Sequence, residues 1–196
     1  MKIVFFGTPH FAATNLNALI NAGYDILGIV CPPDSKKGRG KQLKPCAVKE
    51  VGIANNIPVL QPLKLRDDDF IHQLKSLNAD LFVVVAFRML PQSVWSLPSK
   101  GTINLHTSLL PNYRGAAPIN WVLINGEKET GITTFFIDQQ IDSGAIIKQK
   151  KIELTDKTTA AELHNTLMNK GSELLINTLN SIKNNTVSHQ EQEHNL

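Results

Sequence analysis

The fold is decided by residues 2–31, which read KIVFFGTPHFAATNLNALINAGYDILGIVC. Residues 3–6 form a continuous apolar run, which is typical of a strand that is buried on both faces. A Gly-Thr-Pro turn follows, and residues 11–22 then carry apolar side chains at helical spacing until Gly23 ends the helix. A second apolar run occupies residues 26–31. This order of strand, helix and strand indicates parallel strands that are joined by a crossover helix.

The same alternation of apolar runs and helical patterns continues along the chain. We expect further strands at residues 58–60, 81–86 and 102–106, and further helices at residues 48–55 and 68–77. The strands lack a polar face, so both of their faces must be covered. The sequence therefore predicts an α/β, Rossmann-like fold, with a mainly parallel sheet and helices on both faces.

The pattern of the last third of the chain is different, because two apolar runs are joined there by a short, turn-rich link. The expected elements are a helix at 117–123, neighbouring antiparallel strands at 132–137 and 145–152, and a long amphipathic helix at 158–183. Thr158 is the expected N-cap of the long helix, and Glu162 lies close to the capping-box position. Antiparallel strands are thus expected near the C-terminal side of the fold.

The bulk composition restricts the class of protein. With 196 residues and 42% hydrophobic residues, the chain can bury one substantial core or at most two small ones. Cys31 and Cys46 lack the spacing of a metal or redox motif and are expected to be free thiols. No apolar run reaches the roughly 18 residues of a membrane helix, and the N-terminus reads as a strand rather than a signal peptide. We expect a cytoplasmic monomer without a membrane partner.

Basic residues cluster in the segment 36–44, which reads KKGRGKQLK. Together with Lys49, it places six of the twenty Lys and Arg residues within fourteen positions, although the formal net charge of the chain is only +3. Contacts to phosphate act at long range and tolerate varied geometry, so such a segment suits a polyanion. An ordinary solvated surface is the alternative.

A polar pair, Asn104 and His106, lies two residues apart on an expected strand, so the two side chains share one face. Polar residues at the carboxyl end of a strand in an open α/β sheet lie where ligands usually bind. In the loop that follows, Arg114 beside Gly115 suits a clamp on an anionic or carbonyl group. Asp142 lies in a later turn, where it either stabilises the turn or acts on the histidine.

Together these groups suit acyl transfer. An asparagine amide and an imidazolium can both donate hydrogen bonds to a developing oxyanion. Asp142 can hold His106 charged and relay the proton that an attacking amine loses. The sequence offers no serine or cysteine nucleophile with a clear base and no cluster with metal-ligand spacing. We therefore expect direct attack by a substrate amine, with no metal.

At these residues the chain resembles the formyltransferases that use 10-formyltetrahydrofolate. The resemblance covers nearly the whole chain and rests on the Asn-x-His strand, the loop Ser-Leu-Leu-Pro-x-x-Arg-Gly at 108–115 and the Asp-x-Gly turn at 142–144. It implies formyl transfer from 10-formyltetrahydrofolate, with Asn104, His106 and Asp142 as catalytic residues. The folate-binding residues that it implies are Arg88, Met89, Leu90, Ser108, Leu109, Leu110, Pro111 and Asp138.

Within this family the chain is most similar to the members that formylate initiator methionyl-tRNA for translation initiation. The start at residues 6–12 and the basic segment carry this similarity. It implies tRNA contacts at Lys37, Arg39, Lys41 and Lys44. It also implies a catalytic domain at 1–184 and, at 185–196, the start of a linker to a C-terminal tRNA-binding domain.

The chain departs from the family pattern at two places. His10 replaces a more usual acidic residue, and the stretch around Arg88 differs from the commoner form.

Sugar-nucleotide N-formyltransferases share the catalytic pattern but usually lack the basic segment. A hydrolase that releases formate from the folate would need no tRNA-binding loop. A non-catalytic nucleotide-binding module would leave the polar trio unexplained.

Overall fold

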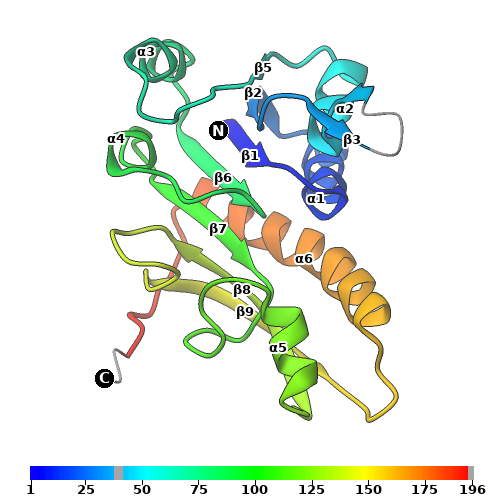
Figure 1. Ribbon diagram of the computed structural model, residues 1–196. Helices are drawn as coiled ribbons and strands as arrows, with labels where there is room; N and C mark the ends of the chain where they lie inside the picture. Colours follow the sequence, from blue (N-terminus) through cyan, green and yellow to red (C-terminus); the bar gives the residue numbers. More distant parts are fainter. Residues whose placement is uncertain (38–41, 194–196) are drawn as a thin grey trace. The chain divides into compact units, whose positions relative to one another are not determined.

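The computed structural model describes residues 1–37 and 42–193, and the chain divides into two compact units. Unit 1 is Met1–Thr102 and unit 2 is Ile103–Leu196 (Figure 1). The division falls at the start of strand β7 (Thr102–His106), the strand on which the polar pair was expected. The parallel and antiparallel parts that the sequence predicts therefore belong to different units.

Unit 1 contains a parallel sheet. Its strands lie in the order β5 (Val59–Leu60), β2 (Asp25–Val30), β1 (Lys2–Gly7) and β6 (Leu81–Val85). The apolar run of β1 is completely buried, and the ring of Phe6 packs against that of Phe82 with 5.2 Å between centroids. The parallel strands predicted from continuous apolar runs are confirmed.

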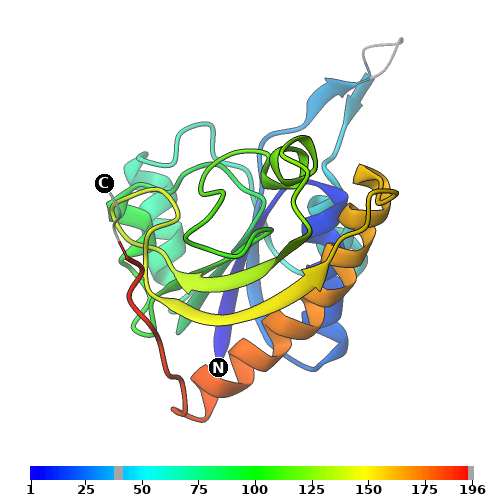
Figure 2. The ribbon, with the colours of Figure 1, turned by 90° about the horizontal axis from the view of Figure 1, so that it is seen from below.

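Helices cover both faces of this sheet, as predicted (Figures 1 and 2). The helices of one face are α1 (His10–Asn21) and α2 (Ala47–Ala54), and those of the other are α3 (Asp68–Ser76) and the short α4 (Gln92–Trp95). The turn after β1 needs glycine because a Cβ atom on Gly7 would lie 2.7 Å from that of Ala12. The glycine thus lets α1 begin close against the strand.

The basic segment forms an antiparallel hairpin that the sequence did not predict. Strand β3 (Ser35–Lys37) pairs with β4 (Gln42–Lys44), and the strands are too short to show a hydrophobic alternation. Of the expected tRNA contacts, Lys37 ends β3 and Lys44 ends β4 with an exposed side chain, whereas Arg39 and Lys41 lie outside the described residues.

Lys49, counted with the basic segment in the sequence, has a separate role in the structure. Its ammonium group donates to both carboxylate oxygens of Asp34 at 2.9 and 2.7 Å and to the amide oxygen of Gln61 at 2.8 Å. Asp34 precedes β3, and Lys49 lies on α2 after β4, so the ion pair closes the base of the hairpin. Lys49 is therefore part of the support of the hairpin.

Unit 2 is built on antiparallel strands, with β8 (Glu129–Phe136) between β7 and β9 (Ile146–Glu153). Helix α6 (Ala160–Lys183) packs on β8 and β9 and also contacts α5 (Pro118–Ile124). The expected antiparallel pair and the long helix are confirmed.

The N-cap of α6 is Thr159 rather than the expected Thr158. The Thr159 hydroxyl accepts from the Glu162 backbone N–H at 3.2 Å, and the Glu162 carboxylate accepts from the Thr159 N–H at 2.9 Å. A capping box needs this spacing of three residues, which Thr158 does not have. The Thr158 hydroxyl instead accepts from the backbone N–H of Thr155 at 3.0 Å.

The two cysteines are free thiols, as expected, and both are buried. A hydrogen bond with Cys46 and burial raise the pKa of the Cys31 thiol far above its usual range. Across residues 1–37 and 42–193, no helix combines the length and apolar character that a membrane crossing requires.

Candidate active site

The polar pair lies at the carboxyl end of β7, where the sequence placed it. Asn104 pairs with Phe135 and His106 with Thr133 of β8, so both side chains project from the same face of β7. Ile103 and Leu105, on the other face, are buried at 0% and 4% exposure. The Asn104 side chain is partly exposed, and in the described part of the chain its amide makes no hydrogen bond. Its N–H groups are available to a ligand.

The His106 ring is held between a carbonyl and a carboxylate. Its Nε2 atom lies 2.8 Å from the Tyr113 carbonyl oxygen and donates to it, because a carbonyl can only accept. Its Nδ1 atom faces the Asp142 carboxylate, with 3.6 Å between Nδ1 and Oδ2. The His106 side chain is only 8% exposed and that of Asp142 only 16%. In the doubly protonated ring, both N–H groups point toward an acceptor.

Asp142 has both roles that the sequence left open, since it lies in a turn and also faces His106. Its Oδ2 atom accepts the Gly115 backbone N–H at 2.8 Å, and its φ of 51° is in the left-handed region. Gly144 is required nearby because a Cβ atom there would lie 1.8 Å from the Phe136 carbonyl oxygen. The close turn thus aims the carboxylate at the ring.

Buried polar contacts fix the loop after β7. The Thr133 hydroxyl donates to the Ser108 carbonyl at 2.7 Å and accepts the Leu110 N–H at 3.1 Å. The Ser108 hydroxyl donates to the Asn112 carbonyl at 2.7 Å, and the Gln149 amide donates to the Leu110 carbonyl at 2.8 Å. Ser108 and Leu110, both expected at the folate, are buried parts of this support.

The other loop residues expected at the folate differ in exposure. Leu109 is half-buried and lies against Gly131, where a Cβ atom would meet its side chain at 2.4 Å. Pro111 is exposed. Sequence reasoning missed the supporting residues Thr133 and Gln149. A threonine inside the apolar run of β8 was the signal, because a buried hydroxyl needs partners.

Tyr113 is fixed at both ends. Its hydroxyl donates to the Glu127 carboxylate and accepts from the Asn125 amide at 3.0 Å. The hydrogen bond to Glu127 raises the pKa of the Tyr113 hydroxyl above its usual value. Its backbone φ is 58°, which helps to turn the carbonyl toward His106.

Arg114 and Asp138 make contacts within unit 2. The Arg114 guanidinium donates to the Gln192 amide oxygen from Nε at 3.1 Å and from Nη2 at 2.7 Å. Asp138 accepts from the Gln140 N–H at 2.9 Å and from the Ser143 hydroxyl at 2.8 Å. Asp138 therefore stabilises the turn that carries Asp142.

The remaining expected folate residues belong to unit 1. Arg88 donates to the carbonyls of Leu63 at 3.0 Å and Pro62 at 2.7 Å, which fixes its guanidinium. Met89 is 67% exposed, whereas Leu90 is buried at 5%. An exposed methionine beside a fixed arginine provides an adaptable apolar contact for a ligand.

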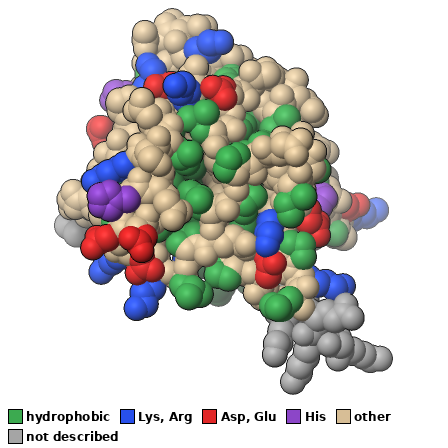
Figure 3. All heavy atoms as spheres, turned by 90° about the horizontal axis from the view of Figure 1, so that it is seen from above, with side chains coloured by type: hydrophobic (Ala, Val, Ile, Leu, Met, Phe, Trp, Pro, Cys, Tyr) green, Lys and Arg blue, Asp and Glu red, His purple; other side chains and the backbone are tan. Residues whose placement is uncertain are grey.

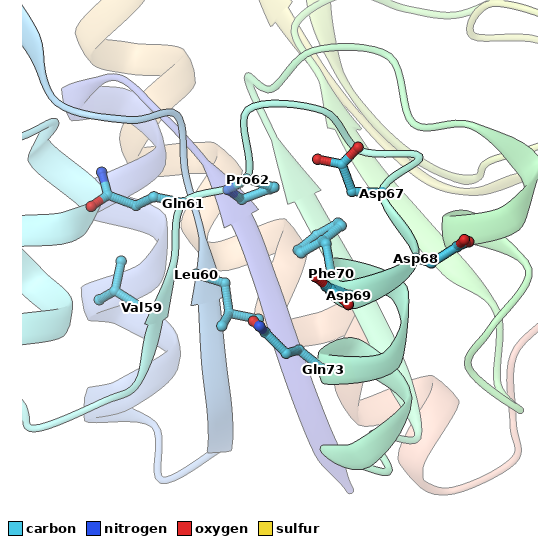
Figure 4. Close-up of a pocket in the computed structure, with 9 residues that line it drawn as sticks. All are labelled: Val59, Leu60, Gln61, Pro62, Asp67, Asp68, Asp69, Phe70 and Gln73. Atoms are coloured by element: carbon cyan, nitrogen blue, oxygen red, sulfur yellow. The ribbon is translucent and has the colours of Figure 1, made fainter.

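Unit 1 also contains an open cavity of about 630 Å³ that the sequence did not indicate (Figure 4). It is lined by Val59, Leu60, Gln61, Pro62, Asp67, Asp68, Asp69, Phe70 and Gln73. The three carboxylates lie at the N-terminus of α3, where negative charge complements the helix dipole. Among the described residues, no three His, Cys, Asp or Glu side chains are grouped to hold a metal ion.

Several large apolar side chains reach the surface, and hydrophobic side chains (green) lie between charged ones in Figure 3. In unit 2 they include Ile141, which is 57% exposed and directly precedes Asp142. On α5, Trp121 and Ile124 are 54% and 70% exposed and lie three residues apart, on one side of the helix.

Comparison with known proteins identifies the family. Residues 1–179 match the family model described as formyl transferase. The chain belongs to the formyl transferase family. This confirms the resemblance that the motifs around Asn104, His106 and Asp142 indicated.

Relatives in this family are similar over the whole chain. A methionyl-tRNA formyltransferase of Flavobacterium johnsoniae is 52% identical over 195 residues, which are 100% of this chain and 62% of the relative. One from Clostridioides difficile is 51% identical, over 99% of this chain and 63% of the relative. The chain thus spans a little under two thirds of the length of these formyl transferases.

A solved structure has the same fold at low sequence identity. The N-formyltransferase of Helicobacter canadensis, in complex with folinic acid and dTDP-3-aminofucose, superposes with a TM-score of 0.76. It is 22% identical, and the match covers 99% of this chain and 68% of that one. The expected formyl transferase fold is confirmed.

Proposed function

We propose that this chain transfers the formyl group of 10-formyltetrahydrofolate to the amino group of methionine on initiator methionyl-tRNA. The relatives that are 52% and 51% identical have this acceptor in their names. The observation that carries the chemistry is the His106 ring, which lies between the Tyr113 carbonyl and the Asp142 carboxylate. Asn104 projects from the same face of β7.

In this proposal the amine nitrogen of methionine attacks the formyl carbon, and the formyl oxygen becomes an oxyanion. The Asn104 amide donates a hydrogen bond to this oxyanion. The Tyr113 carbonyl occupies Nε2 of His106, so Nδ1 is the ring nitrogen that acts on the reacting groups. The 3.6 Å between Nδ1 and Asp142 is too long for a direct hydrogen bond and suits a bridging water or substrate atom.

Collapse of the tetrahedral intermediate completes the transfer. The bond from the formyl carbon to the folate nitrogen breaks, while the new bond from that carbon to the methionine nitrogen is kept as an amide. Asp142 accepts the proton that the attacking amine loses and relays it, through water, to the departing folate nitrogen. Atoms and charge balance without an oxidant, a metal or a covalent intermediate on the protein.

We place the folate donor on the residues that the family resemblance implies and the tRNA on the basic segment 36–44. The folate contacts are Arg88, Met89, Leu90, Ser108, Leu109, Leu110, Pro111 and Asp138. The presence of folinic acid in the Helicobacter canadensis structure supports a folate ligand in this fold. The tRNA contacts are Lys37, Arg39, Lys41 and Lys44, and the exposure of Lys44 supports this assignment.

A transfer assay tests the proposal. The natural protein receives 10-formyltetrahydrofolate with charged methionyl initiator tRNA, with an amino-sugar nucleotide, or with no acceptor. We expect formyl-methionyl-tRNA in the first reaction and no comparable turnover in the others. Formylation of the sugar nucleotide alone would favour a sugar-nucleotide enzyme. Release of formate at the same rate without an acceptor would favour a hydrolase.

A further inference from the structure

The segment after α6 contributes a buried side chain to the site. Within residues 184–193, only Gln192 is buried among the described positions, with 5% exposure. The segment is polar and has no hydrophobic pattern, so a loose connection was the sequence expectation. A buried amide needs hydrogen-bond partners, and the partners of Gln192 belong to the catalytic loops.

Every hydrogen-bonding position of the Gln192 amide is used. Its Nε2 atom donates to the Asp142 carbonyl at 3.0 Å and to the Gly144 carbonyl at 2.8 Å. Its Oε1 atom accepts from Nε and Nη2 of Arg114 at 3.1 and 2.7 Å. An amide has two donor hydrogens and two acceptor lone pairs, so all four are satisfied.

Backbone and ring contacts hold the segment beside the turn that carries Asp142. Gln190 exchanges two backbone hydrogen bonds with Ile146, at 2.7 and 2.8 Å. The His189 ring lies edge-on to that of Phe136, with 6.2 Å between centroids. Figures 1 and 2 show the segment (red) running back along the loop between β8 and β9. These contacts deliver Gln192 to Asp142.

We propose that Gln192 is a positioning residue for formyl transfer, which holds the backbone of Asp142 and the guanidinium of Arg114 in one geometry. This inference rests on the proposed function. Asp142 has a left-handed backbone, and its carboxylate is tied at one oxygen by the Gly115 N–H. Gln192 ties the carbonyl of the same residue, so the carboxylate keeps its distance from His106.

The substitution Gln192→Glu tests this role. It keeps the acceptor for Arg114 but replaces the donating amide NH2 group by an oxygen that faces the carbonyls of Asp142 and Gly144. A shift of about 1 Å in a catalytic group can cost about 100-fold, so we expect kcat to fall by at least about 10-fold. We expect the KM values for folate and methionyl-tRNA to change by less than about 3-fold.

Gln190→Glu is the matched control, since it makes the same charge change on an exposed side chain, and among the described residues Gln190 forms hydrogen bonds only through its backbone. It should keep the kcat and pH–rate profile of the natural protein. Gln192→Met provides a neutral second variant of similar length, in case the added charge prevents folding. It should also lower kcat.

The pH–rate profile and the melting temperature separate positioning from mere support. A positioning role predicts a lower kcat and an altered pH–rate profile at temperatures well below the Tm of the variant. A lower Tm with an unchanged kcat and profile would overturn the inference. If the natural protein does not formylate methionyl-tRNA, the proposed function fails. If Gln192→Glu is as active as Gln190→Glu, only the role of Gln192 fails.

Discussion

The loops around His106 in unit 2 and the basic hairpin of unit 1 are both polar, but they are held in different ways. The carbonyl of Tyr113 accepts a hydrogen bond from the His106 ring. Asp142, which faces that ring, accepts the Gly115 N–H at its carboxylate and the Gln192 amide at its carbonyl. The hairpin consists of three-residue strands, and the described side chain of Lys44 is exposed.

This difference follows from the two tasks that we propose. Acyl transfer needs donors placed to within a fraction of an ångström of a developing charge. Attraction to phosphate is long-range and tolerates many geometries. The loops therefore accept left-handed residues such as Tyr113 and Asp142, whose strain the surrounding hydrogen bonds offset.

The largest effect is expected for the catalytic groups. His106→Ala or Asp142→Asn should remove about 3–4 kcal/mol of transition-state stabilisation, which lowers kcat/KM several hundred-fold. Asp156→Asn is the control, because Asp156 is exposed and paired only with Lys128 among the described residues. Steady-state kinetics measure the loss. Near-normal turnover in either catalytic variant would refute the mechanism.

Gly144→Ala should break the turn that gives the loops their precision. Its Cβ atom would lie 1.8 Å from the Phe136 carbonyl, so the backbone must move. We expect the free energy of unfolding to fall by about 2–3 kcal/mol and kcat to fall with it. At Gly126 a Cβ atom meets open space, and Gly126→Ala should cost about 1 kcal/mol for its φ of +65°. Equal losses of the free energy of unfolding in the two variants, measured by urea unfolding, would contradict the steric argument.

Substitutions in the basic segment 36–44 should affect one substrate only. Arg39→Ala or Lys44→Ala should raise the KM for tRNA far more than the KM for folate. Each should also reduce the slope of log KM against log salt concentration by about 1. Lys157→Ala removes an exposed charge from unit 2 and should leave both values unchanged. Equal effects on both substrates would show that the hairpin does not select the tRNA.

The smallest effect concerns the base of the hairpin. Hydrogen bonds from Lys49, and then from Gln61, hold the pKa of Asp34 below its ordinary value of 3.8. A carboxyl group whose pKa is lower in the folded than in the unfolded state adds to the free energy of unfolding when the pH is above its unfolded-state pKa. This contribution is lost as the pH falls through its folded-state pKa. Asp34→Asn should therefore lower the urea midpoint slightly at pH 7 and not at pH 2.

Asp25→Asn is the control for this measurement, because Asp25 is exposed at the start of β2. Asp25→Asn should leave the difference between the urea midpoints at pH 7 and pH 2 as it is in the natural protein. An Asp34→Asn variant with the same midpoint difference as Asp25→Asn would mean that the ion pair adds nothing to the stability of the hairpin base.

The sequence by itself determined the parallel sheet, the long helix and the choice of Asn104, His106 and Asp142 as candidate catalytic residues. Continuous apolar runs such as 3–6 and 81–86 favour a strand that is covered on both faces. Spacing of two on β7 sets Asn104 and His106 on one face. The hairpin and α4 were missed because elements of three or four residues show no period.

Only the tertiary structure decided what surrounds the trio. The partners of His106 and Asp142 come from separate turns, and the bond between Arg114 and Gln192 spans 78 positions of the chain. Local patterns report which side of an element is buried. They cannot report which distant carbonyl or amide meets a given side chain, because that depends on how the strands and loops pack. The polar sequence of residues 184–193 therefore reads as a loose connection, while in the folded chain Gln192 donates hydrogen bonds to the backbone of the turn that carries Asp142.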